Sequence, residues 1–251
     1  MYMEKKVDLK NKNQDTQKLP WWKKYIPLIF IMTAGVIFSL VVFIVMRQEE
    51  YEGMKMTFDL AAEERAVGIE KSVADQMIVL EAVHSFFYEA DSVSRDEFKG
   101  FVKPFFKHVE GIQALEWIPW VLDEERAKYE NKAREDGLAG FSIREIIPQG
   151  DMVSAGKRSE YFPVYFVEPY QGNEASAGFD LASNPVRLSA LNEARSTGKS
   201  IATERIKLVQ EKREQYGFLL FMPVFKKGMA VNTVEERKNS LVGFVLGVFR
   251  I

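Results

Sequence analysis

The chain has 251 residues, of which 47% are hydrophobic, and its formal net charge is −2. It contains no cysteine, which excludes disulfides, thiolate metal sites and cysteine nucleophiles. Charge is distributed unevenly, because residues 1–24 hold seven lysines and three acidic residues, whereas the part after the first apolar segment holds 27 basic and 33 acidic residues. Nucleic-acid binding calls for a basic patch, so this mildly acidic part predicts no nucleic-acid partner.

A long apolar segment follows the lysine-rich start of the chain. Its 22 residues, Tyr25–Met46, contain no charged side chain and would span roughly 33 Å as a helix, which matches a bilayer core. Trp21 and Trp22 stand at one end, where amphipathic rings favour the headgroup level. Lysines precede the segment and glutamates follow it, so the positive-inside rule places the N-terminus in the cytoplasm. The sequence predicts a cytoplasmic tail (1–24), a transmembrane helix (25–46) in the cell's inner (plasma) membrane, and a periplasmic or extracellular remainder.

Two other interpretations of the apolar segment remain weaker. A cleaved signal peptide has a shorter apolar region and small residues at its cleavage site, and Val45-Met46-Arg47 offers none. A buried core helix rarely contains 22 uncharged residues in succession.

The segment 47–90 is predicted to form a stalk helix. It contains no proline, and apolar or aromatic residues recur at spacings of three or four. Such a stripe can pack on the domain that follows or on a second copy of itself, and we expect both along different lengths. The second possibility predicts a parallel homodimer through the stalk helix, with contacts from Val73, Met77 and Leu80.

The next segment contains signals of two helices and two strands. A capping-box pattern at 94–97 opens a helix, which Pro104 should kink or shorten. The apolar run 112–122 predicts a strand. A helix is expected from 123 to about 135, stopped by the glycine that follows. A second strand is predicted around 141–146.

The remaining part consists of short predicted strands around one helix. Asn184 is a candidate N-cap and Pro185 a candidate first residue for a helix that ends at Thr197-Gly198. Strands are predicted over 161–167, 200–208, 216–225 and 240–251. Antiparallel strands with interposed helices and no regular βαβ alternation indicate an α+β domain.

Residue types suited to catalysis or metal binding are sparse. There are two histidines, His84 and His108, and no histidine pair or carboxylate cluster with the spacing of metal ligands. The adjacent glutamates at 124–125 and 235–236 fit solvated helix starts. No nucleophile elbow or phosphate-binding glycine loop is present. We therefore expect no catalytic residue, metal or cofactor in this chain.

Several runs in the second half resemble the CHASE domain, the extracytoplasmic sensor of cytokinin receptors and of many bacterial histidine kinases and diguanylate cyclases. Upstream, the aromatic-rich strand and helix at 112–130 are similar to the family as well. Together the similar segments cover roughly residues 82–251. Their order, position and spacing agree with those of the family. The runs that carry the resemblance in the second half are SEYFPVYF (159–166), FDL (179–181), RLSALNEARSTGK (187–199), IAT (201–203), YGFLLFMPVFK (216–226), TVEER (233–237) and GFVLGVF (243–249).

The resemblance implies a long helix followed by two PAS-like subdomains over residues 91–251, with a ligand in the membrane-distal subdomain. It places the ligand-bonding carboxylate at Asp180 and an assisting hydroxyl at Thr203. A carboxylate at a pocket edge can accept hydrogen bonds from ring N–H groups while apolar walls bury the rest of a small, adenine-like ligand. The candidate walls are Phe162, Tyr165, Phe179, Leu219 and Phe221, for which ordinary core packing is the competing interpretation.

Two departures from the plant pattern lie near the expected pocket. The loop 168–178 has its own composition, and Thr203 is followed by Glu204-Arg205 in place of a small residue and a proline. These differences put cytokinin itself in doubt and leave the sensor role intact. The sequence thus predicts a small-molecule sensor that signals to a cytoplasmic output module beyond residue 251. The alternative is a membrane-tethered PAS-like scaffold without a small-molecule ligand.

Overall fold

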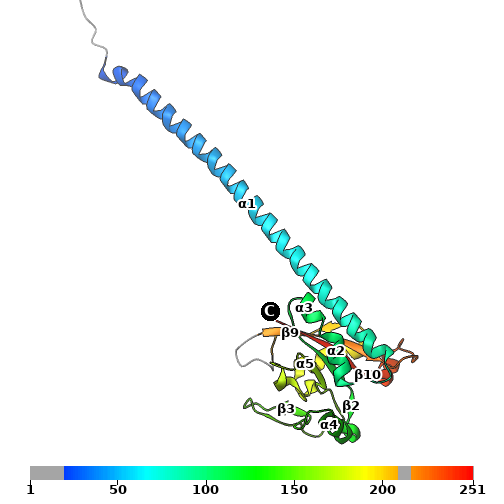
Figure 1. Ribbon diagram of the computed structural model, residues 1–251. Helices are drawn as coiled ribbons and strands as arrows, with labels where there is room; N and C mark the ends of the chain where they lie inside the picture. Colours follow the sequence, from blue (N-terminus) through cyan, green and yellow to red (C-terminus); the bar gives the residue numbers. More distant parts are fainter. Residues whose placement is uncertain (1–19, 209–215, 251) are drawn as a thin grey trace, which may run out of the picture. The chain divides into compact units, whose positions relative to one another are not determined.

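The computed structural model describes residues 20–208 and 216–250 (Figure 1). The cytoplasmic tail is expected over residues 1–24, and its first 19 residues lie outside the described residues. One helix, α1 (Trp21–Glu89), includes both the segment predicted to cross the membrane and the segment predicted to form the stalk. The chain divides into two compact units, residues 1–66 and residues 67–251.

In the first unit, α1 exposes apolar side chains on every side. Phe30 and Phe38, for example, are 73% and 71% exposed. The hydroxyl of Thr33 donates to the carbonyl of Ile29 at 2.7 Å, which satisfies a polar group that has no water partner in lipid. Within the described residues, this is the one helix long and apolar enough to cross a membrane, with a mean hydropathy of 2.9 over its most apolar window.

In the second unit, the last turns of α1 pack on a sheet together with two short helices. Leu80 and Val83 of α1 are fully buried there. Helix α2 (Arg95–Val102) begins with the predicted capping box, and Glu97 Oε2 accepts from the Ser94 backbone N–H at 2.8 Å. The Ser94 hydroxyl donates to the same oxygen at 2.7 Å, and this bond together with that of the Ser94 N–H lowers the pKa of Glu97. Pro104 separates α2 from α3 (Phe105–His108), as its ring predicts.

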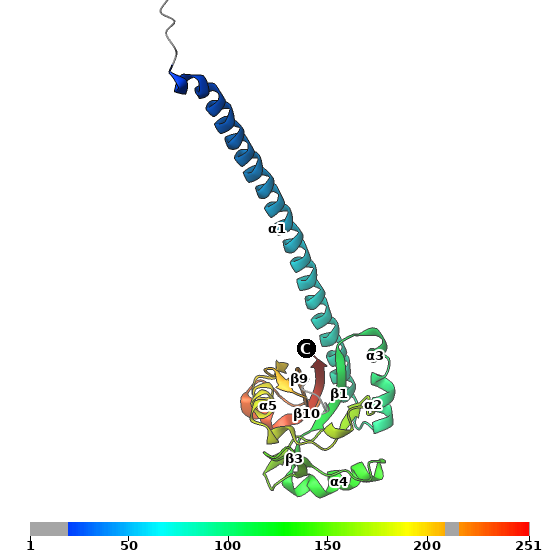
Figure 2. The same cartoon turned by 90° about the vertical axis from the view of Figure 1, so that its left-hand side faces the viewer.

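The main sheet has six strands, all antiparallel, in the order β6-β1-β10-β9-β7, with β8 also paired to β9. Its centre is formed by the two long strands β9 and β10, in which Val245 lies opposite Met222. Figure 2 shows α5 (Pro185–Thr197) on one side of the central strands and α2 on the other. The strands are β1 (Ile112–Pro119), β6 (Phe166–Glu168), β7 (Ile201–Ala202), β8 (Ile206–Lys207), β9 (Tyr216–Phe225) and β10 (Leu241–Arg250).

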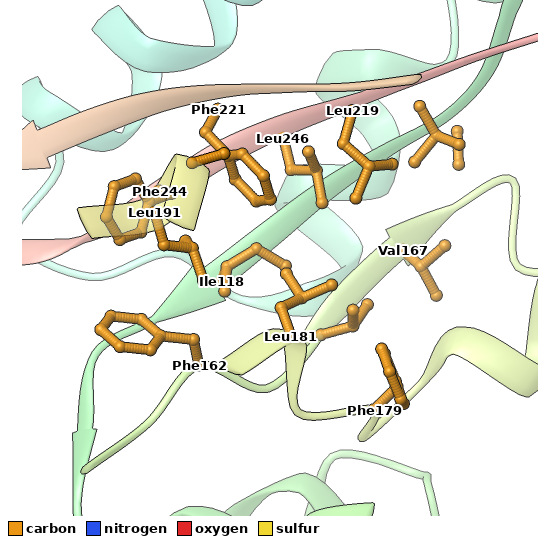
Figure 3. Packing of buried hydrophobic residues seen from close by; sticks show 14 of the residues in the cluster. Ile118, Phe162, Val167, Phe179, Leu181, Leu191, Leu219, Phe221, Phe244 and Leu246 are labelled. Carbon is orange, nitrogen blue, oxygen red and sulfur yellow. The ribbon is translucent and has the colours of Figure 1, made fainter. Parts of the chain in front are cut away.

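Side chains alternate between two cores because successive strand residues point to opposite faces. On the α5 face, Phe244 and Leu246 of β10 meet Ile118 of β1 (Figure 3). On the opposite face, Val245 and Phe249 of β10 pack against α1 and α2. We call these the α5 face and the α1 face of the sheet.

A smaller layer is attached at one end of the sheet. It contains β2 (Val121–Leu122) paired with β5 (Glu160–Tyr161), β3 (Arg144–Ile146) paired with β4 (Met152–Ser154), and α4 (Arg126–Glu135). Arg126 holds this layer together. Its guanidinium donates to the carbonyls of Ala155 at 2.8 Å and Ile143 at 3.1 Å, and it lies 5.0 Å from the ring centre of Tyr161.

The remaining elements are short and lie between these strands. They are the 3₁₀ turns η1 (Asp123–Glu125), η2 (Glu174–Ser176) and η3 (Leu181–Ser183), and the helix α6 (Val234–Ser240). The architecture is a long apolar N-terminal helix followed by an antiparallel-sheet domain, which confirms the predicted α+β class.

Three single strands predicted from the sequence are wrong. Residues 112–122 divide into β1 and β2, which belong to different sheets. Residues 161–167 form the end of β5 and the start of β6, with an irregular segment between them. In this segment Pro163 has no N–H, and the N–H of Phe162 donates to the Asp180 carboxylate at 2.9 Å instead of to a neighbouring strand. Residues 200–208 divide into β7 and β8, which both pair with β9.

Candidate ligand-binding site

A small cavity lies in the α5 face of the sheet. Its volume is about 10 Å³, close to the minimum for a single water molecule. It is enclosed by strands β1, β9 and β10, by α5, and by the segment around η2 and η3. The lining residues are Glu116, Val164, Ser176, Phe179, Leu181, Arg187, Leu208, Leu219 and Val248.

Two charged side chains lie in this cavity, whose other lining residues are apolar except for Ser176. Arg187 of α5 is 5% exposed and Glu116 of β1 is 1% exposed. The Arg187 guanidinium lies 5.0 Å from the ring centre of Phe179, and its Nη2 donates to the carbonyl of Lys207 at 3.2 Å. Within residues 20–208 and 216–250, its Nε is buried without a hydrogen-bond partner.

Burial dominates the electrostatics of this cavity. It lowers the pKa of Arg187 to about 10, against the opposing effect of the Glu116 carboxylate. Arg187 remains a cation near neutral pH, since that value is still well above 7. A buried cation with an unused donor costs free energy unless an acceptor reaches it, so the cavity is suited to a ligand that brings one.

Asp180, the predicted ligand-bonding carboxylate, is fully buried and bonded to the protein. Its Oδ1 accepts from the N–H groups of Phe162 at 2.9 Å and Ala182 at 3.1 Å, and its Oδ2 accepts from Arg158 at 2.7 Å. Burial raises its pKa, although these hydrogen bonds and the Arg158 charge oppose the shift. The carboxylate therefore fixes the irregular segment after β5 to the start of η3.

Thr203, the predicted assisting hydroxyl, lies elsewhere. Its Oγ1 accepts from the N–H of Leu219 at 3.0 Å, and its own N–H donates to the Leu219 carbonyl at 2.8 Å. The residue borders a surface groove of about 390 Å³ between α5 and β7. Neither Thr203 nor Asp180 is among the residues that line the core cavity, so the structure does not bring the two together there.

The five predicted wall residues fall into two groups. Phe179 and Leu219 line the cavity, and Phe162 and Phe221 belong to the same buried cluster on the α5 face (Figure 3). Tyr165 belongs to the cluster on the α1 face. The predicted set therefore includes part of the cavity wall and one residue from the other side of the sheet.

The sequence interpretation did not include Glu116 or Arg187. A signal for Glu116 was available, because it is the one charged residue in the apolar run 112–122, and a charge inside a buried strand is rarely without a reason. Arg187 had a weaker signal, since an arginine in the first turn of an amphipathic helix is usually solvated.

Comparison with known proteins identifies the class. The CHASE domain matches residues 91–251, and the chain belongs to this family. A curated relative is hybrid signal transduction histidine kinase A of Dictyostelium discoideum, which is 25% identical over 228 residues. That alignment covers 86% of this chain and 10% of the relative, so the chain spans about a tenth of the relative's length.

These findings confirm the predicted family. CHASE domains are sensor domains, so this chain carries the sensor part of a signalling receptor. The apolar helix near its N-terminus fits a receptor of the membrane. Within the residues that the structure describes, no group of three or more His, Asp or Glu side chains is placed to hold a metal ion.

Proposed function

We propose that the chain binds a small molecule outside the cytoplasm and transmits this binding across the membrane to a cytoplasmic output module such as a histidine kinase or a nucleotide cyclase. In this proposal residues 1–24 form the cytoplasmic tail, 25–46 the membrane span, 47–90 the stalk and 91–251 the sensor domain. The buried, partly unsatisfied guanidinium of Arg187 inside an apolar cavity is the observation that carries it.

The chemistry of the cavity favours a planar ligand with both donors and acceptors. Arg187 can donate to a ring nitrogen or carbonyl, Glu116 can accept from a ring N–H, and Phe179 offers an aromatic face. An adenine-like molecule has this combination. Asp180 and the pair Phe162 and Phe221 then support the wall from behind.

The small volume of the cavity supports a switching mechanism. Drug-sized ligands occupy pockets of roughly 300 Å³ or more, so a ligand here must bind an expanded conformation better than the closed one. Glu116 lies on β1, which pairs with β10, and an added Cβ at Gly247 of β10 would lie 2.8 Å from Leu80 of α1. A displacement of the sheet would therefore reach α1 directly.

The test uses the full chain in lipid nanodiscs. A thermal-shift screen against adenine derivatives, amino acids and small carboxylates should give a stabilising compound, because a ligand of the native state raises its stability by mass action. Arg187→Lys keeps the charge but loses the planar donor group, and should weaken binding of that compound at least tenfold. Lys199→Met, at an exposed position, serves as the control. Equal affinity in a folded Arg187→Lys protein would contradict the assignment.

The nearly filled core also favours the second candidate, a PAS-like scaffold for protein partners. A completely filled core needs no ligand, and a core with a cavity of only about 10 Å³ is close to completely filled. The same screen separates the two functions, since a scaffold yields no small molecule that stabilises wild type more than Arg187→Lys.

We also propose a parallel homodimer through the stalk. Val73 is 49% exposed and Ile69 is 66% exposed, so both are available to a second copy. Leu80 is fully buried against its own sheet, so its contact is made within the chain. Single cysteines at 69 and 73 should crosslink in membranes, whereas a cysteine at 80 should not. Crosslinking at none of the exposed positions would remove the dimer from the proposal.

A further inference from the structure

The α1 face of the sheet contains a second and larger hollow. It is an open cleft of about 290 Å³ between the end of α1, the following turn, α4 and the sheet. All of these parts belong to the unit of residues 67–251. The cleft shares no lining residue with the core cavity, and it is already open in the structure.

Aromatic rings form the inner surface of this cleft. Trp117 of β1 stacks on Phe87 of α1, with ring centres 3.9 Å apart. Tyr165 meets Tyr129 of α4 edge to face, with ring centres 5.6 Å apart. Rings of this kind offer apolar area and negatively polarised faces, which suit a flat aromatic group or an organic ammonium.

One polar group in the cleft wall has no partner. Tyr165 is 5% exposed, and within the described parts of the chain its hydroxyl is buried without a hydrogen bond. Burial raises the pKa of Tyr165 to about 12, so the hydroxyl stays protonated and can donate. Leaving such a group unsatisfied costs free energy, which an acceptor on a ligand would recover.

The rim carries charges of both signs. Lys128 and Lys132 lie one helical turn apart on α4, both exposed, and neither forms an ion pair with the described residues. Asp91, on the turn after α1, and Glu125 supply negative charge. A zwitterion carries one positive and one negative group, so it can interact with the lysines and the carboxylates of the rim at the same time.

We propose that this cleft binds an aromatic α-amino acid, with its ring on the Trp117 and Phe87 surface. Its carboxylate would lie toward Lys128 and Lys132 and accept from the Tyr165 hydroxyl, and its ammonium group would lie toward Asp91. Phe87 belongs to α1, so an occupied cleft would hold the end of α1 against the sheet. The cleft would then act as a second input to the same signalling helix, independent of the core cavity.

The first test compares three probes on the full chain in nanodiscs by calorimetry. L-Tryptophan is a zwitterion, indole-3-propionate lacks the ammonium group, and tryptamine lacks the carboxylate. L-Tryptophan should bind about twofold to fivefold tighter than either analogue, in line with the strength of exposed ion pairs. Absence of tryptophan binding, or equal affinity for indole-3-propionate, would overturn the proposal.

Variants then locate the site. Lys128→Gln with Lys132→Gln should weaken tryptophan binding about fivefold to tenfold, and Tyr165→Phe about threefold to tenfold without loss of stability. The matched control is Lys103→Gln with Lys107→Gln, two exposed lysines away from the cleft. Unchanged tryptophan affinity in both cleft variants would contradict the site.

One further variant separates this site from the core cavity. Arg187→Lys should leave tryptophan affinity unchanged, even if it abolishes binding of a core ligand. Loss of tryptophan binding in Arg187→Lys, with the cleft variants unaffected, would place the amino acid in the core cavity and overturn the proposal for the cleft.

Discussion

The two faces of the main sheet hold their polar groups in different ways. On the α5 face, Glu116 and Arg187 are buried inside a cavity of about 10 Å³. On the α1 face, charges stand at the rim of an open cleft of about 290 Å³ whose inner surface is aromatic. One face must rearrange before it can admit a ligand, whereas the other is already shaped to receive one.

This difference determines whether a ligand would change the conformation of the domain or would only fill a site that is already formed. A ligand changes a conformational equilibrium only to the extent that it binds one state better than the other. A nearly filled core that contains two buried charges would meet that condition, because a ligand there would require an expanded state. A ligand in a preformed cleft would need little rearrangement and would mainly stabilise the existing packing, which here is the contact of α1 with the sheet.

The largest effect is expected at Asp180, between Phe179 and Leu181 of the cavity wall. Asp180→Ala removes the acceptor of two backbone N–H groups and the partner of Arg158, so it should lower the free energy of unfolding by about 3–5 kcal/mol. Asp180→Asn keeps an acceptor oxygen and should cost less. Urea unfolding of the full chain in detergent measures both.

The exposed Asp151 provides the control, since Asp151→Ala should leave stability unchanged. The resemblance to the family leads to a different expectation, in which Asp180→Ala folds normally and loses ligand affinity by about 1.5–3 kcal/mol. A stable Asp180→Ala protein with weakened binding would support that expectation and contradict the structural role argued here.

Sequence patterns predicted best those features that depend on neighbouring residues. Asn184 caps α5 by accepting from the N–H of Val186 at 3.1 Å, and Gly198 ends the helix with a φ of 71°, which glycine adopts without strain. The capping box of α2 and the full length of β9 were likewise predicted. Each of these signals lies within a few positions of the element that it defines.

The core cavity depended on contacts distant in sequence. Arg187 and Glu116 line the same cavity, although α5 and β1 lie far apart in the sequence. The prediction of a continuous strand over 161–167 failed because the Asp180 carboxylate, 18 positions further on, binds the N–H of Phe162. Tyr165 lies three positions after Phe162, an odd separation, and strand alternation alone would have placed the two on opposite faces.

A smaller effect is expected where α1 meets β10 on the α1 face. A Cβ added at Gly247 would lie 2.6 Å from the Phe249 ring and 2.8 Å from Leu80 Cδ1. Gly247→Ala should therefore overpack this contact and lower stability by about 1–3 kcal/mol. Gly140→Ala is the control, because nothing lies within 4 Å of its added Cβ. Equal melting temperatures for the two variants would show that α1 does not press on β10 as described.

The smallest effect concerns pH and again the α1 face. His84 of α1 stacks on Tyr88 with ring centres 6.0 Å apart, and its ring lies near the backbone of Pro223 in β9. Burial lowers its pKa below 6.5, although the Pro223 contact and Glu81 oppose the shift. The unfolded chain therefore takes up a proton near pH 6.5, while the folded chain does so only at lower pH.

Between those two pH values the unfolded state binds more protons, so the free energy of unfolding should fall as the pH is lowered below about 6.5. His84 is only partly buried, and solvent keeps the change small. Unfolding measured from pH 7.5 to pH 5 should show a shallower pH dependence in His84→Gln than in wild type. His108→Gln, which changes the other histidine at an exposed position, should keep the wild-type slope. An identical slope in His84→Gln and wild type would show that the contact between α1 and β9 does not depend on the neutral imidazole, and that the α1 face is insensitive to pH in this range.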